Sequence, residues 1–341
     1  MSDILYLGNK LSKFGLNPTS VETLGERFLE DFECVRGSKK KNPLLRLLDM
    51  WFLIVQNHKA RYLLIDTYST NAFWFSVSCS WLARLVKLPY IPILHGGNLP
   101  NRKKRSPRAL RSLLKGAAQV VCPSQYLMSE MEDFYSRNYE LIPNFIDLKN
   151  YPLNPKSMDA GIHLLWVRSF HEIYNPFLAI DVLRLLSERG QEVSLAMVGP
   201  DKDDSLEKTK HYAKEKGLFT NVHFTGGITK AEWIELSKDY NIFINTTDVD
   251  NTPVSVMEAM ALGFPVISTN VGGLPYLIRS GFDGLLVNKG NAEAFVNQIL
   301  RLSTDQELYK TLSINARQKA ESWDWPHIRQ KWLALLKGMP K

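Results

Sequence analysis

Two carboxylates flank the start of a predicted helix in the segment DVDNTPVSVMEAMALG. The strand-like run NIFINT precedes it, so Asp250 falls in a loop and Glu258 falls about two turns into the helix. Carboxylates in these places can accept hydrogen bonds from the vicinal hydroxyls of two sugar rings. Pro253 suits the first turn because its missing N–H would have no partner there. We therefore expect the turn of Thr252, Pro253 and Val254 to present free N–H groups to an anion or a hydroxyl.

Asp248 and Asp250 also form an Asp-x-Asp pair, which holds a metal ion in some sugar-nucleotide sites. Such metal sites occur in proteins that have a single nucleotide-binding domain. Cationic side chains and helix dipoles can instead offset the charge of a departing diphosphate. We therefore predict no metal, and we expect Asp248 to face solvent or to cap a turn.

Cationic side chains follow other strand-like runs. Arg168 comes directly after LLWV, and a planar guanidinium can bind phosphate oxygens in pairs. His95 follows YIPIL and precedes two glycines, which allow a ligand to approach the backbone closely. His171 is a further candidate, three residues after Arg168. The structural alternatives are a salt bridge for Arg168 and a partly buried, hydrogen-bonded ring for His95.

Glycines end several of the same runs. Gly8 opens a polar loop that contains Lys13, and we expect both residues to lie near phosphates. Gly199 and Gly226 end runs in the second half of the chain, where the alternative is an ordinary turn. The sequence has no intact Gly-x-Gly-x-x-Gly and no P-loop, so hydride transfer and ATP hydrolysis lack their characteristic motifs.

Elements that would position these residues alternate along the chain. Apolar, strand-like runs cover residues 3–8, 62–68, 90–97, 117–124, 139–145, 162–167, 193–199, 221–226, 241–246, 264–269 and 283–287. Helical patterns cover residues 44–56, 73–87, 176–190, 206–217, 230–239 and 255–263. Such alternation predicts parallel sheets covered by helices on both faces, with ligands outside the carboxyl ends of the strands. The Pro- and Asn-rich stretch at 147–161 is typical of a linker, so we predict two doubly wound α/β domains.

Length and composition agree with a two-domain globular protein. The chain has 341 residues, which is too many for one ordinary core. Its cysteines are few and widely spaced, which favours reduced thiols rather than a zinc site or a disulfide framework. No signal peptide is evident, and the apolar segments are shorter than the roughly 20 residues of a membrane-spanning helix. We expect a cytoplasmic protein.

Charge is distributed unevenly between the two halves. Residues 1–150 carry 21 Lys and Arg against 13 Asp and Glu, whereas residues 151–341 carry 21 against 22. The basic runs at 39–41 and 102–105 have two interpretations. They are either solvated surface residues or a surface that binds anionic lipid or a lipid-linked acceptor. Peripheral binding to the inner face of a membrane is therefore one of two interpretations of this charge. We expect no nucleic-acid partner, since no recognition motif accompanies the charge.

These motifs together resemble the family-4 (group 1) retaining glycosyltransferases, which have the GT-B fold. Asp250 to Glu258 and the following AMALGFPVISTNVGG resemble the acidic-x7-Glu signature of that family. The segments LHGGNLP, AAQVVCPSQYLMSEM, ELIPNFID and LLWVRSF resemble further parts of it, so the resemblance covers nearly the whole chain.

The resemblance implies an acceptor-side domain at 1–150, a nucleotide-sugar-binding domain at 155–324, and a helix at 325–341 that packs back on the first domain. It implies that Glu258 binds the nucleotide ribose, Asp250 the donor sugar and Arg168 the diphosphate. His95 would contact the donor sugar or its phosphate, and the loops of Gly199 and Gly226 would contact the nucleobase. The reaction would be a hexosyl-type transfer from a nucleoside-diphosphate sugar to a carbohydrate or lipid-linked acceptor, in polysaccharide or lipid-linked glycan synthesis, with no cofactor.

The sequence departs from the family pattern at two places. Asp250 stands where the family usually has Glu, and Ile173, Tyr174 and Asn175 stand where it usually has a diphosphate-binding Lys followed by Gly. Because of the missing Lys, two alternatives stay open: a non-catalytic sugar-nucleotide-binding protein, and a sugar-nucleotide epimerase of the same fold.

Overall fold

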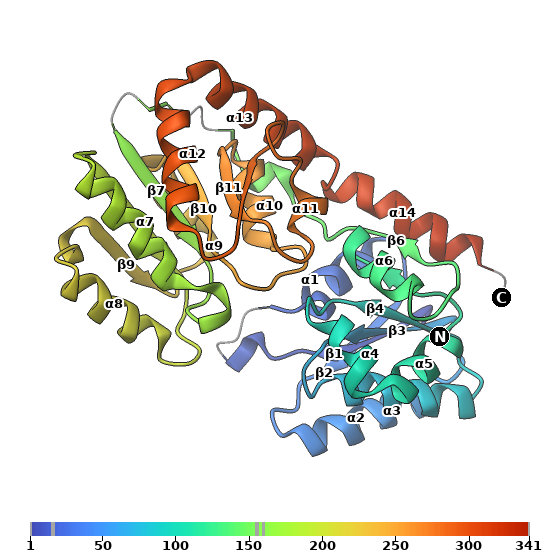
Figure 1. The fold of residues 1–341 in the computed structure, drawn as a ribbon. Coiled ribbons are helices and arrows are strands. Elements are labelled where there is room, and N and C mark those ends of the chain that lie inside the picture. Colours follow the sequence, from blue (N-terminus) through green and yellow to red (C-terminus); the bar gives the residue numbers. More distant parts are fainter. Residues whose placement is uncertain (1, 15–17, 154–156, 159–160, 340–341) are drawn as a thin grey trace. The chain divides into compact units, whose positions relative to one another are not determined.

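The computed structural model describes residues 2–14, 18–153, 157–158 and 161–339. The chain forms two compact units (Figure 1): unit 1 is Met1–Pro143 with Leu335–Lys341, and unit 2 is Asn144–Ala334. Residue 155, the predicted start of the second domain, lies outside the described residues, as do residues 340 and 341 of the predicted last helix. None of the described helices is long and apolar enough to cross a membrane.

Unit 1 contains a six-stranded parallel sheet in the order β2-β1-β3-β4-β5-β6. The central strands are buried on both faces, which explains their continuous apolar sequences. One strand, β2, has no counterpart among the predicted runs, because its sequence CVRGS contains a charge and a glycine. The strands are β1 (Ile4–Asn9), β2 (Cys34–Ser38), β3 (Tyr62–Thr67), β4 (Tyr90–Leu94), β5 (Val121–Cys122) and β6 (Glu140–Leu141).

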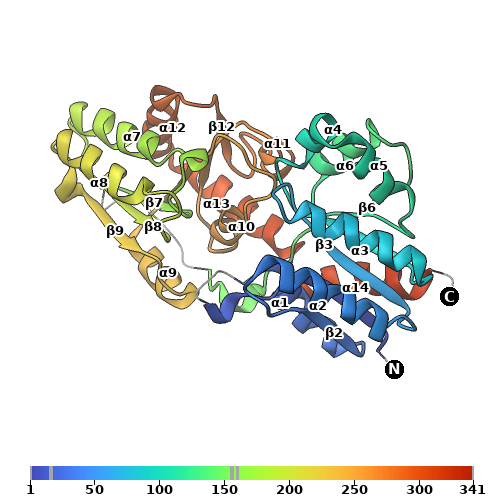
Figure 2. The ribbon, with the colours of Figure 1, turned by 90° about the horizontal axis from the view of Figure 1, so that it is seen from below.

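The helices of unit 1 cover this sheet. Helices α2, α3 and α5 share one hydrophobic core with β1, β3 and β4, so they lie on one face of it. Helices α2 and α3 lie side by side (Figure 2). The helices are α1 (Ser20–Arg27), α2 (Pro43–Gln56), α3 (Phe73–Leu85), α4 (Arg102–Arg105), α5 (Pro107–Lys115) and α6 (Gln125–Glu132), with 3-10 turns η1 (Ser12–Phe14), η2 (Phe28–Glu30) and η3 (Leu99–Asn101).

Unit 2 contains a second six-stranded parallel sheet, in the order β12-β11-β10-β7-β8-β9. Each of its strands lies within a predicted run, so the predicted doubly wound α/β class is confirmed. The strands are β7 (Ile162–Val167), β8 (Val193–Val198), β9 (Val222–Gly226), β10 (Ile242–Asn245), β11 (Val266–Thr269) and β12 (Leu285–Val287).

Two hydrophobic cores, one on each face of this sheet, hold the helices of unit 2. Helix α10 begins at Val254, so Glu258 lies just over one turn from its start rather than the predicted two turns. The helices are α7 (Pro176–Glu188), α8 (Ser205–Glu215), α9 (Lys230–Leu236), α10 (Val254–Ala261), α11 (Leu274–Leu277), α12 (Ala292–Thr304) and α13 (Gln306–Glu321), with 3-10 turns η4 (Leu148–Asn150), η5 (Glu172–Tyr174), η6 (Phe219–Asn221) and η7 (Ser237–Asp239). The last helix, α14 (Trp325–Gly338), begins in unit 2, and its residues from Leu335 belong to unit 1.

Both sheets contain a point where the order of the strands reverses. In unit 1, the chain places β2 on one side of β1 and the later strands on the other, so the reversal lies between β1 and β3. In unit 2, it lies between β7 and β10. Loops that leave neighbouring strands in opposite directions open a crevice at such a point, and ligands of doubly wound sheets bind there.

Candidate functional site

An ion pair lies at the reversal point of unit 2. Arg168 directly follows β7 and Asp250 lies in the loop after β10, and these strands are neighbours. Arg168 Nη2 donates to Asp250 Oδ2 at 2.5 Å, and both side chains are almost buried. Burial raises the pKa of Asp250, whereas the Arg168 guanidinium and the Asn251 N–H lower it. The pair therefore keeps a cation and a carboxylate together in a site with little water.

Tyr174 supports the arginine of this pair. The guanidinium carbon of Arg168 lies 3.9 Å from the centre of the Tyr174 ring, which is a close cation–π contact. Asn175 follows in the left-handed conformation, with φ of 47°, and its side chain accepts a hydrogen bond from the Leu178 N–H at the start of α7. Asparagine is one of the few residues other than glycine that visit this conformation readily. The ring thus stacks on Arg168 in the segment where the family has its lysine.

Glu258 occupies a second polar position in unit 2. It is 5% exposed, and its Oε1 accepts from the Tyr151 hydroxyl at 2.6 Å and from Lys230 Nζ at 2.6 Å. Burial, and then the charge of Glu258, raise the pKa of Tyr151, so the hydroxyl stays protonated and donates. Within the described part of the chain, both side-chain contacts of Glu258 go to Oε1. Its other oxygen can therefore accept from a ligand hydroxyl.

The start of α10 connects these two groups. Thr252 is partly buried, Pro253 is buried and precedes the first helical residue, and Val254 is exposed. The hydroxyl of Ser255 is buried and has no hydrogen-bond partner among the described residues. A helix start with an unsatisfied hydroxyl and free N–H groups is suited to binding an anion.

Asp248 and Asp250 have different partners. Asp248 lies 3.4 Å from Lys289 Nζ and accepts from Asn175 Nδ2 at 3.4 Å, whereas Asp250 pairs with Arg168. Among the residues that the structure describes, no group of three or more His, Cys, Asp and Glu side chains is arranged to hold a metal ion.

Glycines allow neighbouring loops to pack against the backbone of the ion pair. A Cβ on Gly199 would lie 1.8 Å from the Arg168 carbonyl oxygen, and its φ of 149° is one that other residues rarely adopt. A Cβ on Gly272 would lie 2.1 Å from the Asp250 carbonyl oxygen. The Gly199 N–H donates to the Gly226 carbonyl at 2.9 Å, which joins the β8 and β9 loops. These contacts give Gly199 a definite role in positioning Arg168.

His171 lies in the same loop as Arg168 but has its own contacts. Its Nδ1 accepts from the Ile173 N–H at 3.2 Å and lies 3.7 Å from Asp203 Oδ2. The ring is about one-third exposed. It caps η5, the turn that brings Tyr174 onto Arg168.

A buried carboxylate occupies the reversal point of unit 1. Asp66, on β3, accepts from the Tyr6 hydroxyl at 2.7 Å and contacts His95 Nε2 at 2.8 Å. The His95 ring stacks on Tyr68 with centroids 5.4 Å apart. Gly8 is required here, because a Cβ on it would lie 2.5 Å from Asp66 Oδ2. Nε2 of His95 is therefore engaged, as in the structural alternative for this residue.

Several of these residues were missed by sequence analysis. Asp66 had a signal, since an acid inside an otherwise apolar strand must be hydrogen-bonded when buried. Tyr151 and Lys230 had none, because only tertiary contacts bring them to Glu258, and Tyr174 was noted in place of the missing lysine without its contact to Arg168 being predicted. Of the predicted residues, the structure brings Arg168 and Asp250 into contact, and it places Gly8, Lys13 and His95 in unit 1 and the others in unit 2. Lys13 is exposed in η1.

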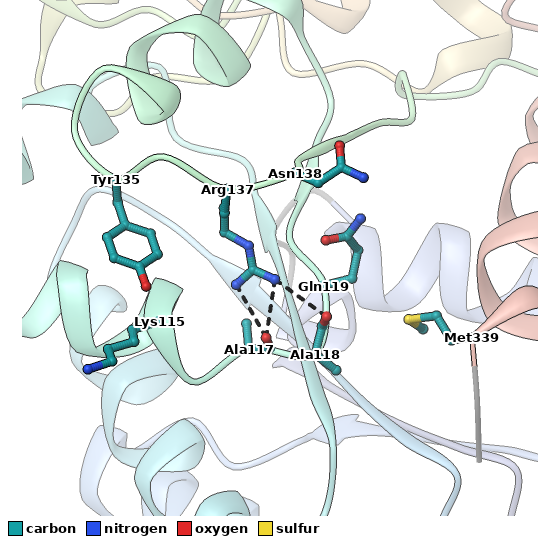
Figure 3. A pocket seen from close by; sticks show the side chains of 8 residues that line it. All are labelled: Lys115, Ala117, Ala118, Gln119, Tyr135, Arg137, Asn138 and Met339. Carbon is teal, nitrogen blue, oxygen red and sulfur yellow. Dashed lines mark hydrogen bonds between the residues drawn. The ribbon is translucent and has the colours of Figure 1, made fainter.

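A separate hollow on unit 1 has no comparable chemistry. It is lined by Lys115, Tyr135, Arg137, Met339 and their neighbours (Figure 3). The Arg137 guanidinium donates to the carbonyls of Leu114, Ala117 and Ala118, so its donors hold the backbone together rather than face the hollow.

Comparison with known proteins agrees with these observations. Residues 4–150 match the family described as Glycosyltransferase Family 4, and residues 157–319 match Glycosyl transferases group 1. The chain is 24% identical over 302 residues to a D-inositol 3-phosphate glycosyltransferase of Corynebacterium glutamicum, covering 79% of this chain and 71% of the relative.

Solved structures show the same fold. The crystal structure of HepE from Anabaena in complex with UDP superposes with a TM-score of 0.78 at 17% identity, covering 98% of this chain and 100% of that one. The complex of the same protein with UDP-glucose gives a TM-score of 0.76 at 18% identity, covering 99% and 100%. The two family matches together cover residues 4–150 and 157–319, which is most of the chain, so the chain belongs to the family-4, group 1 glycosyltransferases and is an enzyme of the GT-B fold.

Proposed function

We propose that the protein transfers a sugar from a nucleoside-diphosphate sugar to an acceptor hydroxyl, with retention of the anomeric configuration and without a metal ion. The observation that carries the proposal is the Arg168–Asp250 pair at the reversal point of the unit 2 sheet. A buried guanidinium at this point can stabilise the negative charge of a leaving diphosphate.

Each side chain of the site then has a role. Oε2 of Glu258 accepts from a ribose hydroxyl, while Tyr151 and Lys230 hold Oε1. Asp250 accepts from a hydroxyl of the donor sugar. Arg168, stacked on Tyr174, and the start of α10 bind the diphosphate. His95 contacts the donor sugar or its phosphate, Gly8 and Lys13 contribute to phosphate binding, and the loops of Gly199 and Gly226 contact the base.

In the transfer step, the acceptor oxygen forms a bond to the anomeric carbon while the bond from that carbon to the phosphate oxygen breaks. In a single step without an enzyme nucleophile, retention requires attack on the face that the leaving group occupied. The proton of the acceptor hydroxyl passes to the departing diphosphate. Arg168 stabilises the negative charge that develops on the departing diphosphate, and it does so in place of a metal ion.

The complexes of HepE with UDP and UDP-glucose support a nucleoside-diphosphate sugar as donor for this chain, and uridine nucleotides are the first ones to test. For the acceptor, the basic first half supports a carbohydrate or lipid-linked substrate in polysaccharide or lipid-linked glycan synthesis, at the cytoplasmic face of a membrane.

The experiment is a transfer assay with UDP-glucose and a panel of sugar and lipid-linked acceptors, in the presence of a chelator, with the product examined by proton NMR. We expect a product with the anomeric configuration of the donor and a rate that the chelator does not change. Loss of activity in chelator that manganese restores would contradict the proposal.

Tyr174, which stands in place of a lysine, favours a second candidate, a protein that binds the nucleotide sugar without transferring it. The same assay separates the two, since that protein would bind the donor in a calorimeter and consume none of it. An epimerase would convert the donor with no acceptor added.

A further inference from the structure

Helix α2 is apolar on two opposite faces. Leu44, Leu48, Phe52 and Val55 are 54–74% exposed, and they fall on one arc of the helix at about 100° per residue. The opposite face, which includes Met50 and Ile54, is buried in the core of unit 1. A helix that is apolar all round is usually covered on every side. The exposed arc is therefore a surface that contacts something apolar.

Helix α3 continues this surface. Trp74, Trp81 and Leu85 are 50–60% exposed and lie at i, i+7 and i+11, which places them on one stripe. Helix α3 packs beside α2, and both bury their other faces in the same core (Figure 2). We call the exposed side chains of α2 and α3 the apolar face; its members are Leu44, Leu45, Leu48, Phe52, Val55, Trp74, Trp81 and Leu85.

The borders of the apolar face carry charge of one sign. Exposed Lys39, Lys40 and Lys41 come just before α2, and α5, which packs against α3, exposes Arg108 and Arg111. Helices α3 and α5 contain no acidic residue. The one acid of α2, Asp49, accepts a hydrogen bond from the Ser38 hydroxyl at 2.5 Å. A partner that fits this surface is apolar at its centre and anionic at its rim.

We propose that the apolar face docks unit 1 onto an anionic lipid bilayer. A bilayer with anionic headgroups offers an apolar acyl layer bordered by negative charge, which matches this surface. A helix face rich in Leu, Phe and Trp next to Lys and Arg is typical of interfacial membrane binding. Tryptophan is favoured at the boundary between headgroups and acyl chains. The docking surface thus lies on α2 and α3, and its rim is formed by the basic run at 39–41 with Arg108 and Arg111 of α5. The inference does not depend on the proposed reaction.

The test is flotation of the full chain with vesicles of phosphatidylcholine and phosphatidylglycerol, compared with phosphatidylcholine alone. The variant is Phe52→Gln with Trp81→Gln. Because both side chains are more than half exposed, we expect its thermal unfolding to match that of the unaltered protein. Its partition onto anionic vesicles should fall by about tenfold or more, since binding scales with buried apolar area.

A matched control, Phe219→Gln with Ile314→Gln, removes two half-exposed apolar side chains from unit 2 and should float like the unaltered protein. A third variant, Lys39→Gln with Lys40→Gln, should weaken binding to the anionic vesicles only. Failure of the unaltered protein to float, or equal flotation of the Phe52/Trp81 variant, would overturn the proposal. So would a dimer in light scattering that this variant converts to a monomer, since the face would then bind a second copy of the chain.

Discussion

The two reversal points of this molecule are built on the same backbone plan but hold their charge differently. In unit 2, Arg168 and Asp250 meet as a cation and an anion. In unit 1, Asp66 is held by the hydroxyl of Tyr6 and the ring of His95, and Gly8 lies close beside it. A guanidinium can turn toward an incoming phosphate, whereas Asp66 is held in place by two side-chain partners. The proposed function therefore assigns stabilisation of the leaving group to Arg168 of unit 2, and the predictions below test this difference between the two units.

The largest effect should follow loss of the cation in unit 2. Arg168→Ala removes the stabilisation of the leaving diphosphate, and we expect the turnover number for transfer to fall by about 10²–10³-fold. Arg184→Ala is the control, because that arginine pairs with Glu188 on the surface of α7. A transfer rate within twofold of normal in Arg168→Ala would show that the cation of unit 2 does not stabilise the leaving group.

The carboxylate of unit 1 should matter to folding instead. Asp66→Ala leaves the buried Tyr6 hydroxyl and the His95 ring without their acceptor, and we expect a loss of about 3 kcal/mol in the free energy of unfolding. Asp181→Ala also removes a Tyr–Asp hydrogen bond, but a half-exposed one, and should cost less than about 1 kcal/mol. Thermal unfolding compares them, and equal losses would show that Asp66 is not a structural anchor.

Glu258 should affect donor binding more than turnover. Glu258→Gln keeps an oxygen for Tyr151 but loses the charge that strengthens a hydrogen bond from ribose, so the donor KM should rise by about tenfold. Glu235→Gln, on the surface of α9, is the control. A fall in the turnover number with an unchanged KM would place Glu258 outside the ribose site.

The pH dependence of stability tests the electrostatics of unit 2. The raised pKa of Asp250 means that its protonated form favours the fold; this contribution is present below the unfolded pKa and is lost as pH rises through the folded value. Arg168 lowers the pKa of Asp250, so without it the pKa rises further, and the stability lost in Arg168→Ala should grow as pH rises above about 4, the ordinary pKa of an aspartate.

Asp250→Asn in the same background removes the titrating group and should abolish that growth. A loss of stability that is independent of pH would show that the pair is not coupled as the geometry indicates.

The smallest effect should come from the aromatic support of Arg168. Tyr174→Leu removes a cation–π contact worth about 1 kcal/mol, so transfer should slow by roughly fivefold. Tyr174→Phe keeps the ring and should behave normally. A large defect in Tyr174→Phe would show that the hydroxyl, rather than the ring, acts in the site.

Sequence analysis identified what local pattern can encode. Strand-like runs alternate with helices, and the carboxyl ends of parallel strands share an edge, so Arg168 and Asp250 were expected near each other and the structure places them in contact. The position of Glu258 was in error by about one turn, because it lies only four residues after Val254, where the helix begins, and one turn takes about 3.6 residues. Tyr151 and Lys230 could not be found, and the contact of Tyr174 with Arg168 could not be predicted, since these contacts depend on how loops and helices pack.

The strand β2 was missed for a different reason. A charged, glycine-containing edge strand lacks the apolar run that marks its neighbours. From the sequence, α2 and α3 contain many apolar residues, but the sequence does not show which of them are exposed. The exposed fraction of each side chain in the structure separates the apolar face from the core.

The central claim is that the Arg168–Asp250 site of unit 2 binds the donor diphosphate, and calorimetric titration with UDP in the presence of a chelator tests it most directly. The account predicts that UDP binds the unaltered protein and Arg184→Ala equally, and that Arg168→Ala weakens binding by about tenfold or more. Equal dissociation constants for all three proteins, or binding that appears only when a divalent metal is added, would contradict it.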